Sequence, residues 1–330
     1  MTDLETGTLD ATGATLGFDV RRPIPGNDDG NDDGNDNGND DGNDNGNDDG
    51  NDNGKGSGST GTGTDGEPRA LLLVGSPMGA DGFRTLASYF TDRTVVTYDP
   101  RGVGRSARTD GAAESSPEEH ADDLRRVIEA LGVGAVDVFA SSGGAVNALT
   151  LVERHADLVH TLVAHEPPLA RVLPDREAAL AACEDIHRTY LREGTGPAMA
   201  KFFVLVSHQG PFPADWTDRP APSPADFGLP TEDDGSREDP LLGQNMRGCT
   251  AHRPDFTALR AAPTRIVVAA GKESGEQFPA RAAAATAAGL GILPALFPGD
   301  HGGFLGGEYG QHGAPEEFAR TLREVLDGNG

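Results

Sequence analysis

Cysteine is scarce in this sequence of 330 residues, which has only Cys183 and Cys249. Two cysteines are too few for a disulfide framework, and these two do not have the spacing of metal ligands. The scarcity excludes a disulfide-stabilised small module and a cysteine-based metal centre. We therefore expect a protein that works in a reducing environment.

Long apolar runs and a basic leader are also absent. Residues 1–6 contain neither a positively charged start nor an apolar segment of a secretory signal, and no later run reaches the length of a membrane span. These absences predict a soluble, cytoplasmic protein that does not enter a membrane.

The sequence has few basic residues. The chain has 27 Lys and Arg against 53 Asp and Glu, for a formal net charge of −26 at pH 7. Contacts with phosphates need clusters of Lys and Arg, so nucleic acids and anionic membrane surfaces are excluded as partners. A small-molecule substrate is the expected partner, and the oligomeric state stays open.

Much of the negative charge lies in one low-complexity block. Residues 27–54 repeat Asn-Asp-Asp-Gly and Asn-Asp-Asn-Gly units, and a Gly/Ser/Thr-rich run follows. Without apolar residues the segment 27–66 cannot form a core, and it is predicted to be a disordered loop after an N-terminal β-hairpin at 1–26. Its Asp29-x-Asn31-x-Asp33 start is similar to a calcium loop, but Asp40 stands where a bidentate Glu is needed. A solvated linker is the preferred interpretation over a calcium-responsive module.

The most informative stretch is 136–146, where an apolar run ends in Ala140-Ser141-Ser142-Gly143-Gly144. A small-x-Ser-x-Gly sequence between a strand and a helix is typical of a nucleophile elbow, a strained turn that exposes a serine hydroxyl. Ala140 and Gly144 are the small neighbours that such a turn requires, and Ser142 is the candidate nucleophile.

Other predicted strands flank the elbow in an ordered series. Apolar or β-branched runs lie at 69–74, 94–98, 263–271 and 295–297, and each leads into a turn rich in glycine or charge. The last of these turns contains His301. A serine followed, beyond further strands, by a late histidine is the chain order of one hydrolase architecture.

With these motifs the chain resembles the α/β-hydrolase fold family, from about residue 69 to the C-terminus. The resemblance implies an α/β fold in which helices flank a mostly parallel sheet and a helical cap is inserted before the last core strands. We assign 67–168 and 256–330 to the core and 169–255 to the cap. Several aromatic residues of the cap are candidates for lining a substrate cavity: Phe202, Phe203, Phe212, Trp216 and Phe227.

Three catalytic roles follow from the elbow. Ser142 needs a base, and His301 can accept its proton and return it near neutral pH. A carboxylate must then orient and stabilise the imidazole. The family's usual acid position is occupied by Ser274, so two acids remain open. Glu166, at the end of the strand after the elbow helix, is preferred to Glu273. Glu273 is one residue away from the position of Ser274, and a shift of one residue turns its side chain in another direction.

The backbone amides of Gly143 and Ser76 are the candidate oxyanion hole, since Pro77 has no N–H to offer. Asp99, Arg101 and Ser106 are expected to brace loops, and His120 to be an exposed or packing histidine of a helix.

These residues predict a carboxylesterase-like serine hydrolase that cleaves an ester or related acyl bond of a small molecule through an acyl-enzyme. Neither a cofactor nor a metal is implied. Alternatives are cofactor-free perhydrolysis, hydrolysis of a carbon–carbon bond, and a non-catalytic ligand-binding member of the fold.

Overall fold

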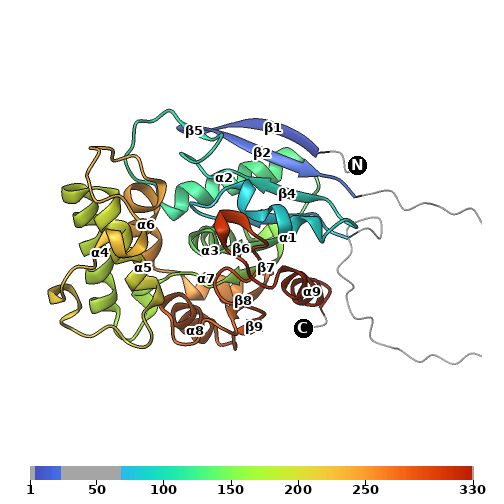
Figure 1. The fold of residues 1–330 in the computed structure, drawn as a ribbon. Coiled ribbons are helices and arrows are strands. Elements are labelled where there is room, and N and C mark those ends of the chain that lie inside the picture. The colour runs from blue at the N-terminus through green and yellow to red at the C-terminus, as the bar shows by residue number, and fades with distance from the viewer. Residues whose placement is uncertain (1–3, 24–67, 329–330) are drawn as a thin grey trace, which may run out of the picture.

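A twisted sheet forms the centre of the molecule. The structure, a computed structural model, describes residues 4–23 and 68–328. Within these residues a nine-stranded sheet has the order β1-β2-β4-β3-β6-β7-β8-β9, and β5 pairs with β2 (Figure 1). The strands are β1 (Leu4–Ala11), β2 (Ala14–Arg21), β3 (Leu71–Val74), β4 (Val95–Tyr98), β5 (Ala107–Arg108), β6 (Val136–Ser141), β7 (Val159–His165), β8 (Arg265–Gly271) and β9 (Ala295–Phe297).

All neighbouring strands from β4 to β9 are parallel, whereas β2 pairs antiparallel with β1, β4 and β5. The predicted mostly parallel sheet is therefore confirmed. The carboxyl ends of parallel strands meet at one edge of a sheet, and ligands bind outside that edge in open α/β folds. The loops that follow β3, β6, β7, β8 and β9 are thus brought together.

Helices cover both faces of the sheet. In β3, Leu72 and Val74 pack into one apolar cluster with α2, α3 and α8, while Leu71 and Leu73 point to the opposite cluster with α1 and α9. The helices are α1 (Arg84–Ser88), α2 (Pro117–Leu131), α3 (Gly143–His155), α4 (Arg176–Glu193), α5 (Thr195–Ser207), α6 (Met246–Ala251), α7 (Phe256–Ala261), α8 (Phe278–Leu290) and α9 (Pro315–Leu326). Burial on both faces explains why the strands are continuous apolar runs.

Local signals set the ends of α2. The Ser116 hydroxyl accepts a hydrogen bond from the Glu119 amide, and the Glu119 carboxylate accepts one from the Ser116 amide, so the two residues form a capping box. Gly132 ends the helix at φ 65°, a left-handed conformation that glycine adopts without strain. Both ends of α2 are thus set by residues of the helix boundary itself.

The chain between β7 and β8 carries α4 to α7. Helices α4, α5 and α6 lie together to one side of the sheet, at the left of Figure 1. They share an apolar cluster of their own, which includes Ile186, Leu205 and Met246. By contrast, α7 packs on the core through Leu259.

The N-terminal residues form an antiparallel hairpin, β1 and β2, that joins the sheet through β4. The low-complexity segment 27–66, for which a disordered loop was the expectation, lies outside the described residues. Among the residues that are described, no helix combines the length and apolar character needed to cross a membrane.

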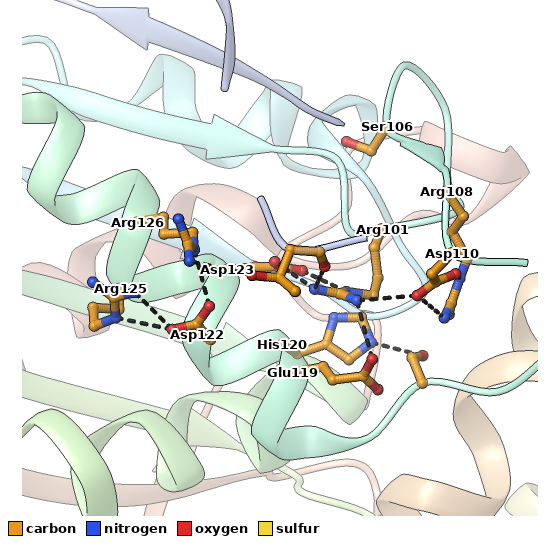
Figure 2. A network of polar contacts seen from close by, with 12 residues as sticks. Arg101, Ser106, Arg108, Asp110, Glu119, His120, Asp122, Asp123, Arg125 and Arg126 are labelled. Carbon is orange, nitrogen blue, oxygen red and sulfur yellow. Dashed lines mark hydrogen bonds and ion pairs between the residues drawn. The ribbon is translucent and has the colours of Figure 1, made fainter. Parts of the chain in front are cut away.

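The turn after β4 is braced by a buried ion pair (Figure 2). Arg101 is only 2% exposed, and its guanidinium donates two hydrogen bonds of 2.7 Å to the fully buried carboxylate of Asp123 on α2. Asp99 accepts hydrogen bonds from the amides of Ala80 and Arg105, and the Ser106 hydroxyl donates to the Asp99 carbonyl. These contacts hold loops together and lie apart from the cavity described below.

Replacing Arg101 with Met should reduce the free energy of unfolding by about 3–5 kcal/mol, because the Asp123 carboxylate would stay buried without its partner. Urea titration at pH 7 measures the loss. The matched control is Arg84→Met, whose ion pair with Asp81 is exposed and should be worth less than about 1 kcal/mol.

A second variant tests the cause of the loss. Arg101→Met combined with Asp123→Leu removes the unpaired charge as well, so it should recover most of the stability lost in the single variant. If Arg101→Met were as mild as Arg84→Met, the pair would not be the brace described here.

Candidate active site

Ser142 lies on a strained turn between β6 and α3. Its backbone has φ 58° and ψ −130°, a region that side chains with a Cβ rarely adopt. Its amide donates a hydrogen bond of 3.0 Å to the carbonyl of His165 at the end of β7. The strand, the sharp turn and the helix have the geometry of the predicted nucleophile elbow, and Ser142 borders a cavity that is described below.

Small residues make the turn possible. A Cβ on Gly143 would lie 2.6 Å from the Ser76 carbonyl oxygen, and one on Gly144 would lie 2.5 Å from the Val74 carbonyl oxygen. Neither distance is tolerable for a real Cβ. Ala140 does not have a positive φ, because the described non-glycine residues with positive φ are Ser142, Glu166 and Tyr309. An alanine at this position is therefore compatible with the elbow.

His301 is paired with Glu166. Its Nδ1 lies 2.6 Å from Glu166 Oε2, and the Gly271 amide donates a hydrogen bond of 2.9 Å to Oε1 of the same carboxylate. Glu166 follows β7, Gly271 ends β8 and His301 lies on the turn after β9. Three neighbouring strand ends thus build the pair.

The environment keeps Glu166 ionised. The carboxyl is fully buried, and burial disfavours its charged form. The hydrogen bond from His301 and the charge of that imidazole outweigh burial and lower the pKa of Glu166 to about 2. An ionised carboxylate can only accept, so the proton between the two groups belongs to His301 Nδ1, and any lone pair that the imidazole offers is on Nε2.

The two candidate acids occupy different environments. Glu273 is exposed, and its backbone amide donates to the Gly299 carbonyl. Within the described chain, the carboxylate that pairs with His301 is that of Glu166. Ser274, at the position where the resemblance implies an acid, is fully buried. The alternative of Glu273 as the acid is thus not supported by the geometry.

Ser142 and His301 border one cavity of about 320 Å³. Ser76 and Gly143, the candidate oxyanion donors, border it too. Most of the remaining wall is apolar and comes from the cap and α8, including Phe202, Phe203, Leu205, Leu241, Met246 and Phe278. Of the five aromatic cap residues considered from the sequence, Phe202 and Phe203 reach the cavity.

The amides of Ser76 and Gly143 are free to donate to a ligand. Gly143 is the first residue of α3, so its N–H has no carbonyl acceptor in its own helix. Neither amide donates to another group in the part of the chain that the structure describes. Ser76 and Gly143 border the same cavity as Ser142, so their amides are the candidate donors to an oxyanion there.

Cys183 and Cys249 are both free and buried, and both border the cavity. Burial raises the pKa of each thiol to about 12, so they are neutral and inert near pH 7. In the described residues, no group of His, Cys, Asp or Glu side chains is arranged to hold a metal ion.

Two buried histidines had no clear local signal in the sequence. His165 lies beneath the pair with its ring stacked 6.0 Å from that of His301. His120 on α2 is fully buried and lies 2.9 Å from Asn245 Oδ1 in the cap. The expectation of an exposed or packing His120 therefore holds only for packing, and its polar contact spans 125 residues.

Comparisons with known proteins agree with this architecture. A family model described as alpha/beta hydrolase fold matches residues 69–202. The uncharacterized hydrolase YraK of Bacillus subtilis is 31% identical over 274 residues, which cover 79% of this chain and 89% of that protein.

Two solved structures are similar in fold. The proline iminopeptidase of Mycobacterium smegmatis has a TM-score of 0.54 and 16% identity, and the match covers 98% of each chain. The thermophilic esterase of Thermogutta terrifontis has a TM-score of 0.55 and 20% identity, over 81% of this chain and 96% of that one. At such identities the likeness speaks for the fold alone.

Replacing His165 with Phe should make the free energy of unfolding depend less on pH below about pH 6.5. Burial lowers the pKa of His165 to about 4, with His301 adding to the effect and the charges of Glu166 and Asp300 opposing it. In the unfolded chain a histidine has a pKa of about 6.5. Protons therefore favour the unfolded state, and this contribution to stability is complete above about pH 6.5 and lost as the pH falls toward 4.

Between pH 7 and pH 4.5, the free energy of unfolding should fall by about 2–3 kcal/mol more in wild type than in His165→Phe, as measured by urea unfolding. Phe suits the site, because aromatic rings surround His165: Phe139, Phe297, Phe304 and Phe318. His312→Ala, at an exposed position, is the control and should keep the wild-type profile. An unchanged profile in His165→Phe would contradict the assignment.

Proposed function

The chain belongs to the α/β-hydrolase fold family, and from this premise we propose that it is a serine hydrolase acting on an ester or related acyl bond of a small molecule. The observation that carries the proposal is the buried Glu166–His301 pair, which borders the same cavity as Ser142 on its strained turn. A nucleophile, a base and an orienting carboxylate are the three groups that acyl transfer to a serine requires.

The first half-reaction forms an acyl-enzyme. His301 Nε2 accepts the proton of the Ser142 hydroxyl as the oxygen attacks the substrate carbonyl carbon. The negative charge that develops on the carbonyl oxygen is received by the amides of Gly143 and Ser76. The tetrahedral intermediate then collapses, the bond to the leaving alcohol breaks, and the alcohol takes the proton from His301.

The second half-reaction releases the acid. His301 takes a proton from water, the hydroxide attacks the acyl carbon, and the proton returns to Ser142 as the ester bond to the enzyme breaks. In both halves the imidazole is transiently cationic. Glu166 stabilises that cation, and its low pKa keeps it ionised throughout the pH range of the reaction.

The cavity favours uncharged, apolar acyl groups, and this supports a carboxylesterase-like specificity. Its described lining includes no lysine or arginine, and Asp300 beside His301 is the one acidic side chain in it. A carboxylate on the substrate would lose its water without gaining a cation, which costs several kcal/mol. Aromatic and aliphatic side chains can instead remove an alkyl or aryl group from water.

Ser142→Ala should lower kcat/KM for p-nitrophenyl butyrate by at least about a thousandfold, because no other group supplies the nucleophile. Glu166→Gln should lower it by about a hundredfold or more, because the imidazole loses its preferred tautomer and its counter-charge. Glu273→Gln is the matched control and should stay within about twofold of wild type. Steady-state kinetics on variants with wild-type melting temperatures measure all three.

Covalent labelling gives an independent readout. A fluorophosphonate probe should label wild type at Ser142 and leave Ser142→Ala unlabelled. Absence of labelling in wild type would favour the non-catalytic ligand-binding alternative, and undiminished turnover by Ser142→Ala would overturn the proposed mechanism. Equal losses in Glu166→Gln and Glu273→Gln would refute the choice of acid.

A matched pair of esters tests the substrate class. The enzyme should hydrolyse p-nitrophenyl butyrate with a kcat/KM about a hundredfold higher than the mono-p-nitrophenyl ester of succinic acid, which has a carboxylate at the same end. Asp300→Asn should narrow this gap several-fold by removing a like charge. Equal rates for the two esters in wild type would contradict an apolar acyl site.

A further inference from the structure

A buried polar network lies behind the loop that follows β3. We propose that Asn245 of the cap is a positioning residue for the reaction, which holds Ser76 so that its backbone amide is placed to receive the oxyanion. The inference rests on the serine hydrolase function proposed above. It assigns to the cap a part in transition-state stabilisation besides its part in enclosing substrate.

The direct contact joins two segments far apart in the chain. The Ser76 hydroxyl donates a hydrogen bond of 2.9 Å to Asn245 Oδ1, and the two residues are 4% and 2% exposed. Ser76 follows β3, whereas Asn245 ends a short π-helical turn, η6 (Pro240–Asn245), just before α6. Both residues border the cavity. Asn245 thus reaches from the cap to the loop of the candidate oxyanion hole.

The orientation of the carboxamide is determined by its partners. Asn245 Nδ2 donates a hydrogen bond of 2.9 Å to the Pro240 carbonyl. The reverse orientation would set two oxygens against each other, so Oδ1 must face Ser76. The amide group therefore cannot itself donate to substrate while it keeps this contact, which makes its role indirect.

His120 provides the second anchor, from the core. Its Nε2 lies 2.9 Å from Asn245 Oδ1, and burial together with the nearby Arg101 charge lowers the pKa of His120 to about 4. The ring is therefore neutral near pH 7. With its one proton on Nε2 it donates to the amide oxygen, and the Ser115 hydroxyl lies 3.0 Å from the same nitrogen. Figure 2 shows His120 next to the Arg101 network, whose ion pair with Asp123 braces α2. The core side of the contact is rigid.

The position of Ser76 matters for both oxyanion donors. The Ser76 carbonyl oxygen lies 2.6 Å from the place where Gly143 would carry a Cβ, so the loop packs directly on the start of α3. Gly75 and Gly79 flank this loop, and a Cβ on either would lie within 2.6 Å of a neighbouring oxygen, so the loop is closely packed. An oxyanion donor acts only within about 2.7–3.1 Å of the developing charge. Without the Asn245 contact, the Ser76 amide would lose that placement.

The proposal is tested by a double-mutant cycle that leaves every backbone donor in place. Ser76→Ala removes only the hydroxyl, and Asn245→Ala removes its acceptor. Each should lower kcat for p-nitrophenyl butyrate by about tenfold or more with KM changed less than about threefold, because a misplaced donor weakens transition-state binding alone. Since both act through one contact, the double variant should be no slower than the slower single variant.

A transition-state analogue separates positioning from general damage. The affinity for an alkyl trifluoromethyl ketone, which forms an oxyanion on Ser142, should fall in each variant by the same factor as kcat/KM. Inhibition by 1-butanol, an uncharged alcohol that forms no oxyanion, should stay within about twofold. Thr189→Val is the matched control, because it deletes a 2.9 Å hydrogen bond of a buried cap hydroxyl away from the cavity. Its kinetics should match wild type.

Three results would overturn the proposal: additive losses in the double variant, a raised KM with an unchanged kcat in Asn245→Ala, or an equal loss of kcat in Thr189→Val. Ser76→Ala keeps the test decisive even if Asn245→Ala folds poorly. The Ser142→Ala variant separates failure of the serine hydrolase function from failure of the role of Asn245. Turnover that survives in Ser142→Ala refutes the serine mechanism, whereas an additive cycle in an enzyme that depends on Ser142 refutes only the role of Asn245.

Discussion

The hydrogen bond between the Glu166 carboxylate and the His301 imidazole is the interaction on which the rest of the site depends. A carboxylate as deeply buried as Glu166 is tolerable only with a charged or polar partner on each oxygen. His301 and the Gly271 amide are those partners, and they come from the ends of neighbouring parallel strands. The register pairs His165 with Ala269 and Gly271 with Phe297, so a slip of one residue would separate the groups. Sheet register is therefore a condition of the chemistry.

Backbone strain is concentrated at two residues of the candidate site. Ser142 and Glu166 both have positive φ, at the ends of adjacent strands, and each such residue costs roughly 1–3 kcal/mol. Backbone hydrogen bonds offset part of this cost, because the Ser142 amide donates to the His165 carbonyl and the Glu166 amide to the Ala269 carbonyl. The strain turns the hydroxyl and the carboxylate out of the sheet edge. A relaxed backbone at either position would continue the strand and bury the side chain between layers.

The features that could be predicted from the sequence are those that depend on residues close together in the chain. Buried strands appear as apolar runs, the elbow as small residues around Ser142, and the end of α2 as Gly132. The acid stayed open between Glu166 and Glu273, because the choice depends on which strand end faces His301, and that is a matter of sheet order. Asn245 was missed for the same reason. Its partners lie far away in the chain, and a single Asn in a cap segment gives no local pattern.

The position of Asn245 links the binding of the acyl group to the stabilisation of the transition state. The cap residues Leu241 and Met246, which shape the apolar wall, flank the residue that contacts Ser76. A change that reshapes this wall for a larger substrate would also move η6, and with it the loop that carries Ser76, the candidate oxyanion donor. Binding energy from the acyl group and stabilisation of the transition state are then coupled through one turn of chain. On the proposed function, the η6 segment of the cap is therefore constrained by the reaction as well as by the substrate.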